Sequence, residues 1–265
     1  MKLQRDQDIT AGKPNDIAVV SPTELLVCDY GSMTVYLVDS IVGVIVTKIS
    51  TPESPIKICV LREGISAVTL EGKKVLFLKV GRGSLTLDTV MEFDNNVYGI
   101  ASLNNNLVVS CVSPSRVEMM TMEGEIICTV DNEEAGRMVS HNPVLLTNSK
   151  DGHIFVSDLK SNTVTKLDNK LVVMRRYTDP NLQLICGIKS ISRDQLLVCC
   201  QNNHRIVMLN TRTGNTTVLL GKQDGLSYPY ALTYCHTQRK LFVVSGVLSK
   251  IQAYKIVNAI AIARN

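Results

Sequence analysis

An internal repeat is the feature of this 265-residue sequence that most restricts its fold. A short apolar segment occurs six times, and each copy lies 41 to 45 residues after the one before it. A period of this length is typical of propellers, solenoids and other repeat arrays. The copies are marked by Ile17, Ile58, Ile100, Leu145, Ile188 and Leu232. One structural unit, repeated six times, is therefore expected to build the whole chain.

Each repeat has the pattern of four short strands. A β-branched run follows the first segment after roughly ten residues, for example at residues 25–28, and residues 75–78 are assigned to this second position in the second repeat. A polar loop, an alternating third run and, in most repeats, a fourth run come next. Four of the six repeats begin shortly after a proline, which fits a rigid turn into a strand: Pro14, Pro55, Pro143 and Pro229.

Six repeats of four strands predict an all-β, six-bladed β-propeller with four antiparallel strands in each blade. A β-sandwich or a barrel also uses many short strands, but neither requires the same four-strand unit at regular spacing. Residues 1–265 are expected to form one domain, with blades at residues 14–53, 54–96, 97–140, 141–183, 184–227 and 228–265. We expect residues 260–264 to supply the last outer strand, with residues 1–10 as the competing segment.

The order of elements within each repeat resembles that of NHL repeats. The closest matches are residues 28–35, 156–164 and 201–207, and the glycine-bounded segment 221–225 ahead of Tyr228 resembles the link between NHL blades. Among NHL proteins, the chain looks most like the divergent C-terminal propellers of tripartite-motif (TRIM) ubiquitin ligases. This resemblance implies that the propeller selects a substrate or binds RNA, while a separate RING domain transfers ubiquitin. The zinc-binding spacing of a RING is missing here, so this chain alone should have no ligase activity.

Composition restricts the compartment and the chemistry. The first ten residues are largely polar and no apolar run of about 18 residues occurs, so neither a secretory signal nor a membrane span is expected. Most of the eight cysteines lie in apolar strand-like runs, no C-x-x-C pair occurs and the four histidines are scattered. We therefore expect a reduced, cytoplasmic protein with no metal and no cofactor.

Loop positions select the candidate binding residues. In a four-strand blade, the turn after the second strand and the link to the next blade lie at the same end, so these segments share one face. Basic residues outnumber the evident acids there, Asp29 and Asp158, which predicts a positive face that also carries tyrosine and asparagine side chains. The predicted partner-binding residues are Tyr30, Arg82, Tyr98, Arg116, Asn142, Lys160, Asn203, His204, Arg205, Tyr228 and Lys250.

The predicted function is a non-catalytic interaction module that recruits a protein substrate for a TRIM-type ubiquitin ligase. Binding of single-stranded or hairpin RNA stays an alternative, because arginine beside aromatic rings and amides suits bases and phosphates. The chain's net charge of +4 does not distinguish a protein partner from RNA. DNA and membrane are not expected as partners.

An enzyme, such as a propeller hydrolase or lyase, is the weakest alternative. Asp16 is the one acid in the six inner segments, and a single carboxylate cannot form the oxygen-rich shell of a calcium site. We expect Asp16 to cap a turn at the start of its strand. No Gly-x-Ser-x-Gly elbow is present, so no catalytic residue is predicted.

Overall fold

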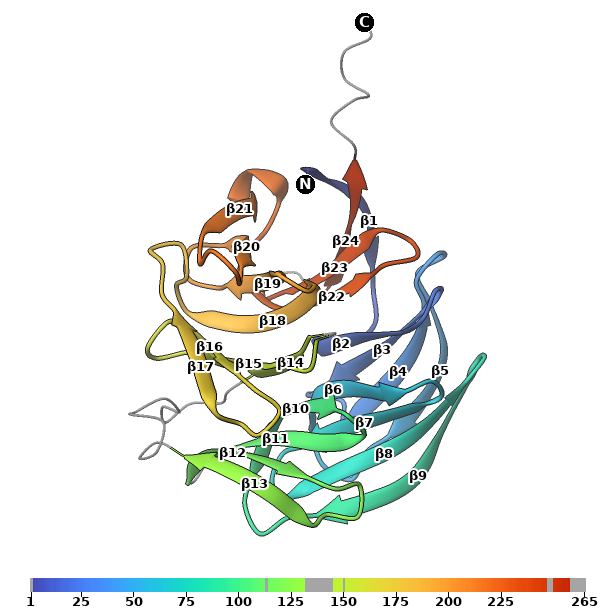
Figure 1. Ribbon diagram of the computed structural model, residues 1–265. Coiled ribbons are helices and arrows are strands. Elements are labelled where there is room, and N and C mark those ends of the chain that lie inside the picture. The colour runs from blue at the N-terminus through green and yellow to red at the C-terminus, as the bar shows by residue number, and fades with distance from the viewer. Residues whose placement is uncertain (1, 113, 132–144, 150, 247–249, 258–265) are drawn as a thin grey trace, which may run out of the picture.

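Six four-stranded antiparallel sheets surround a central axis in the computed structural model (Figure 1). The structure describes residues 2–112, 114–131, 145–149, 151–246 and 250–257. The prediction of an all-β, six-bladed propeller is confirmed. Within the described residues, helix is limited to the short 3-10 turn η1 (Lys222–Asp224).

Five blades are each built from one continuous stretch of chain. Blade one contains β2 (Pro14–Ser21), β3 (Glu24–Asp29), β4 (Thr34–Asp39) and β5 (Val44–Ser50). Blade two contains β6 (Pro55–Arg62), β7 (Ile65–Leu70), β8 (Lys74–Gly81) and β9 (Ser84–Glu92). Blade three contains β10 (Val97–Leu103), β11 (Asn106–Val112), β12 (Ser115–Met120) and β13 (Ile126–Asp131). Blade four contains β14 (Leu145–Asn148), β15 (Ile154–Asp158), β16 (Thr163–Leu167) and β17 (Val173–Tyr177). Blade five contains β18 (Ile185–Ser192), β19 (Gln195–Cys200), β20 (Arg205–Asn210) and β21 (Thr216–Leu220).

The sixth blade combines the two ends of the described chain. It contains β22 (Pro229–Cys235), β23 (Lys240–Ser245), β24 (Lys250–Val257) and, as its outer strand, β1 (Lys2–Ile9). β1 runs antiparallel to β24, from Lys2 opposite Val257 to Ile9 opposite Ile251. The assignment of the outer position to residues 260–264 is therefore wrong, and those residues lie outside the described part. A mostly polar β1, with Leu3 and Ile9 as its buried apolar side chains, explains why an apolar pattern did not reveal it.

The second repeat contains another misassignment. Residues 75–78 belong to β8, the third strand of blade two, whereas the second strand is β7. Serine, alanine and threonine interrupt β7, so the more apolar β8 has the stronger strand pattern. As a result, Arg82 lies in the turn between the third and fourth strands, at the opposite strand ends from the turns after second strands.

The apolar core lies between neighbouring blades. For example, Phe155 of blade four and Leu196 of blade five belong to one buried cluster, which also contains Cys200. The adjacent Cys199 packs in the cluster shared by blades five and six, so these two cysteines face opposite sides of their sheet. All eight cysteines are unpaired thiols, and burial raises the pKa of Cys200 to about 12. Such thiols act as small apolar side chains.

Candidate binding sites

The propeller presents two faces with different connections. We call the end with the turns after second strands and the links between blades the loop face, and the end with the other turns the hairpin face. Arg82 lies on the hairpin face, which corrects its prediction, and Asn142 lies outside the described residues. The remaining predicted residues lie at the loop-face end: Tyr30, Tyr98, Arg116, Lys160, Asn203, His204, Arg205, Tyr228 and Lys250.

Buried aspartates shape two of the loop-face turns. Asp29 is 3% exposed, and its two carboxylate oxygens accept the backbone N–H groups of Ser32 at 3.1 Å and Lys13 at 2.9 Å. Gly12 has a φ of 62°, and a Cβ at this position would lie 2.1 Å from the Asp29 carboxylate. Asp158 holds the β15–β16 turn in a similar way. Its Oδ1 accepts the backbone N–H groups of Lys160 at 2.9 Å and Ser161 at 3.1 Å. Both acids are structural caps rather than solvated surface charges.

Four of the predicted residues come together beside blade five, around an asparagine that the sequence did not single out. Asn203 Nδ2 donates to the Asn181 carbonyl at 3.0 Å, and Arg205 Nη1 donates to Asn181 Oδ1 at 3.0 Å. His204 Nδ1 accepts the backbone N–H of Tyr228 at 3.1 Å, and the two rings meet edge to face with centroids 4.2 Å apart. We call Asn181, Asn203, His204, Arg205 and Tyr228 the blade-five patch.

The blade-five patch combines fixed geometry with groups that remain available. Tyr228 is 45% exposed, although its backbone is held by His204. Asn203 Oδ1 is buried and has no hydrogen-bond partner among the described residues. Burial and the charge of Lys222 lower the pKa of His204, which agrees with a neutral ring whose Nδ1 acts as an acceptor. The patch therefore offers an aromatic surface, a partly buried amide acceptor and a guanidinium.

Other predicted residues have local partners. Arg116 Nε donates to Glu118 Oε1 at 2.5 Å within the same strand, which neutralises its charge. Tyr30 is 41% exposed, and hydrogen bonding to Glu71 raises the pKa of its hydroxyl. Tyr98 lies beside the inner Lys57 and also packs against the buried cluster of blades four and five, which contains Leu182. Arg116 and Tyr30 belong to blades three and one, so they are not part of the blade-five patch.

The loop face carries charges of both signs, whereas the sequence predicted a positive face. Glu53 and Lys74 form an ion pair there, with 2.8 Å between Oε1 and Nζ. The sequence-based count considered the turns after second strands and missed acids in the links and in the true β7–β8 turn. These acids are Glu53, Glu71, Asp94, Asp179 and Asp224, and the same segments also add Lys13, Lys73, Lys74 and Lys222.

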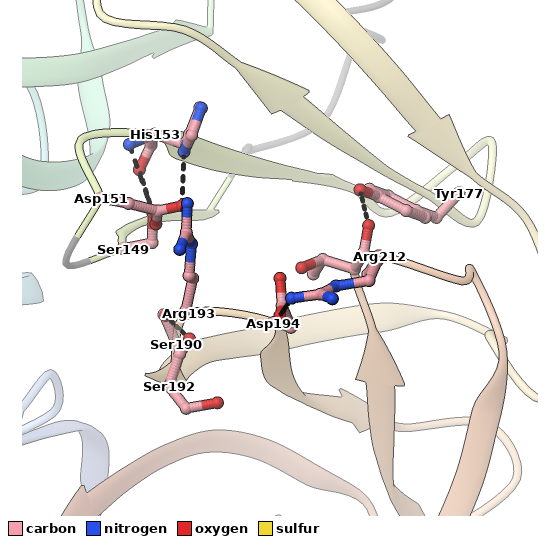
Figure 2. Close-up of polar contacts among 10 residues, drawn as sticks. Ser149, Asp151, His153, Tyr177, Ser190, Ser192, Arg193, Asp194 and Arg212 are labelled. Carbon is pink, nitrogen blue, oxygen red and sulfur yellow. Dashed lines mark hydrogen bonds and ion pairs between the residues drawn. The ribbon is translucent and has the colours of Figure 1, made fainter.

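On the hairpin face, an ion pair between Asp151 and Arg193 links blades four and five. Figure 2 shows Asp151 between His153 and Arg193; its Oδ2 lies 3.3 Å from His153 Nδ1 and 3.5 Å from Arg193 Nε. Ser149 is close by, but its hydroxyl bonds the backbone N–H and carbonyl of His153 rather than the imidazole. A nucleophilic serine needs that bond to the imidazole, so this Ser, His and Asp set does not have the geometry of a catalytic triad.

Asp16 joins two blades instead of capping a turn as predicted. Its Oδ2 accepts the backbone N–H of Ile58, on the inner strand of blade two, at 2.9 Å. Among the residues that the structure describes, no three His, Cys, Asp or Glu side chains gather closely enough to hold a metal ion. No helix in this part of the chain has the length and apolar character needed to cross a membrane.

Comparisons with known proteins support the fold. No protein-family model matches the sequence, and no curated protein matches it either. The β-propeller domain of Cps50 (Swd1) from Myceliophteria thermophila is 12% identical, with a TM-score of 0.72 over 96% of this chain and 100% of that chain. The WD40 propeller of Doa1 is 11% identical, with a TM-score of 0.68 over 97% and 98%. Streptogramin B lyase is 15% identical, with a TM-score of 0.65 over 97% and 87%. At these identities the likeness concerns architecture, and function must be argued from the site.

Proposed function

We propose that this chain is a non-catalytic interaction module that binds a protein partner through the blade-five patch. The observation that carries this proposal is the joint fixation of Asn181, Asn203 and Arg205 beside the half-exposed ring of Tyr228. Tyrosine and arginine are enriched at the centres of protein interfaces, where rigid side chains lose little entropy on binding. A patch that is ordered before binding avoids part of that cost.

The charge of the loop face favours a protein over RNA. RNA binding depends strongly on neutralising phosphates with an excess of lysine and arginine. Here Glu53 pairs with Lys74, and Glu118 pairs with Arg116. We therefore make RNA an outcome of the test rather than a second proposal.

The finer assignment is that the bound protein is a substrate of a TRIM-type ubiquitin ligase. It rests on the NHL-like order of strand end, polar loop and basic strand start at residues 28–35, 156–164 and 201–207. In such a protein, ubiquitin transfer would belong to a RING domain elsewhere. Detection of a RING in the same gene product would support this assignment, and a different catalytic domain in that position would contradict it.

Crosslinking and pull-down from a cell lysate, with and without nuclease, tests the proposed function. The chain and the double variant Tyr228→Ala/Arg205→Ala are compared with Arg82→Ala, a matched control on the hairpin face. We expect a defined protein that survives nuclease, is retained by Arg82→Ala and is lost from the double variant. Recovery of RNA in place of protein, or equal recovery by all three chains, would contradict the proposal.

A further inference from the structure

A cavity runs along the axis of the propeller, apart from the blade-five patch. Its volume is about 500 Å³, which lies in the range of small-molecule sites. The inner strands of all six blades line it, and Figure 1 shows them around the axis: β2, β6, β10, β14, β18 and β22. Pro22 and Thr237, which lie in hairpin-face turns, also belong to the lining. The cavity therefore reaches the hairpin face.

Charged side chains meet at the other end of this cavity. Asp16 Oδ1 lies 3.8 Å from the ammonium nitrogen of Lys57. Lys57 is only 7% exposed, and the same nitrogen lies 5.9 Å from the centre of the Tyr98 ring. Because these residues belong to blades one, two and three, the Lys57 ammonium lies on the axial side of its blade.

Lys189 supplies a second ammonium group from blade five, on the far side of the cavity. Burial raises the pKa of Asp16, and the charges of Lys57 and then Lys189 act against that rise. Lys189 belongs to the lining of the cavity, so its position in β18 borders the channel. In the described lining, two lysines therefore face one carboxylate, which leaves an excess of positive charge.

The contacts of the Asp16 side chain show how groups in this channel hold a carboxylate. Asp16 is held by the Lys57 ammonium and by the inner-strand N–H of Ile58, 2.9 Å from Oδ2. Inner strands are the edges of their sheets, so each directs unpaired backbone groups towards the axis. Lys189 has no carboxylate within ion-pair distance among the described residues. It is thus a second cation in a setting that suits a carboxylate.

We propose that the axial channel binds a small organic monocarboxylate, with its carboxylate against Lys189 and its remaining atoms against the edges of the inner strands. One ligand carboxylate balances the one lysine in excess over Asp16. A second negative charge on the ligand would need a further cation in the lining. Polar side chains such as Thr147, Asn148 and Thr237 also line the cavity, so it offers hydrogen-bonding groups beside Lys189. This site goes beyond the loop-face function, since it lies in the axial channel and uses none of the residues of the blade-five patch.

Benzoate labelled with ¹³C at the carboxylate is a suitable probe, and benzamide is its neutral counterpart of the same shape. We expect the wild-type chain to bind benzoate with a shift of the carboxylate resonance and to bind benzamide at least tenfold more weakly, since benzamide cannot form the charge-assisted bond to Lys189. Lys189→Met, which keeps most of the side-chain volume, should weaken benzoate binding by about the same factor. Lys79→Met, at a lysine whose side chain is 62% exposed on β8, is the control and should bind as wild type.

Asp16→Asn tests the charge balance in the opposite direction. Removing the competing carboxylate should strengthen benzoate binding severalfold, provided that the circular dichroism spectrum stays that of the wild type. Equal binding of benzoate and benzamide, no carboxylate shift at millimolar benzoate, or wild-type affinity in Lys189→Met would each overturn the proposal. None of these outcomes depends on the loop-face partner.

Discussion

Two groups of polar contacts, one on each face of the propeller, differ in how deeply they are buried. On the loop face, the buried Asp29 accepts a hydrogen bond from the backbone N–H of Lys13. The half-buried Asn181 accepts one from the side chain of Arg205. On the hairpin face, Arg193 and Arg212 form ion pairs while their side chains remain 76% and 72% exposed. Exposed pairs contribute little because water competes for both partners, whereas loss of a buried bond leaves a desolvated group unsatisfied. The contacts of Asp29 and Asn181 should therefore fix their segments more firmly than the Arg193 and Arg212 pairs do, although the hairpin face also has buried contacts, such as the bond from the Tyr177 hydroxyl to the Thr211 carbonyl at 2.7 Å.

This difference follows from the topology. Links between blades must span from an outer strand to the next inner strand, and the longer ones need their own internal contacts. Residues 178–184 and 221–228 are such links, and both contribute to the blade-five patch. A surface assembled from several ordered segments suits recognition of a partner.

The largest effect should come from opening the ring, on which both faces depend. Ile9 is fully buried where β1 closes blade six, and we expect Ile9→Ala to lower the free energy of unfolding by about 3 kcal/mol, because it leaves a cavity. Val44→Ala, at an outer-strand residue that is 52% exposed, should change it by less than about 0.5 kcal/mol. Chemical denaturation of both variants measures this. Equal losses would show that β1 does not close the ring.

A matched pair of caps compares the faces directly. Asp29→Ala removes a buried acceptor of two backbone N–H groups, and we expect a loss of about 2 kcal/mol. Asp39→Ala removes an exposed cap of the β4–β5 turn on the hairpin face, where Asp39 accepts the N–H groups of Ile41 and Val42, and should cost about 0.5 kcal/mol. Thermal or urea denaturation distinguishes the two. A larger loss in Asp39→Ala would reverse our comparison of the faces.

A smaller effect concerns protonation within the blade-five patch. Burial and then Lys222 hold the pKa of His204 below its ordinary value of 6.5. A histidine with a lowered folded-state pKa stabilises the fold above its unfolded pKa, and that contribution is lost as the pH falls through the folded pKa. Imidazole NMR during an acid titration should show His204 charging below pH 6.5, with loss of the bond from the Tyr228 N–H. Lys222→Met should move this pKa upwards; a titration above the ordinary value would refute the assigned geometry.

Much of the architecture could be predicted from the sequence, because the repeat length and the four-strand pattern are local properties. The strand β7 was missed because its small and polar residues weaken the apolar pattern. Residues 1–10 were named only as the competing outer strand, because the partner β24 lies at the far end of the chain. Pairing between distant segments leaves no local signal when one strand is mostly polar.

The site was predictable where residues adjoin a recognisable strand, as Asn203, His204 and Arg205 adjoin β20. Asn181 escaped prediction because it lies within a link, although its position after Asp179 and Pro180 is typical of a turn on that face. The roles of Asp29 and Asp158 were also misjudged. A sequence shows that an acid follows a strand, but not that backbone N–H groups surround it.

The most direct test of the central claim is the nuclease-treated pull-down with quantitative mass spectrometry, applied to the wild-type chain, Tyr228→Ala/Arg205→Ala and Arg82→Ala. Our account predicts one defined set of proteins that the wild type and Arg82→Ala recover equally. Recovery of this set by the Tyr228→Ala/Arg205→Ala variant, called the loop-face variant, should be lower by about tenfold or more. Unchanged recovery by the loop-face variant, or loss through Arg82→Ala, would show that the blade-five patch is not the binding surface.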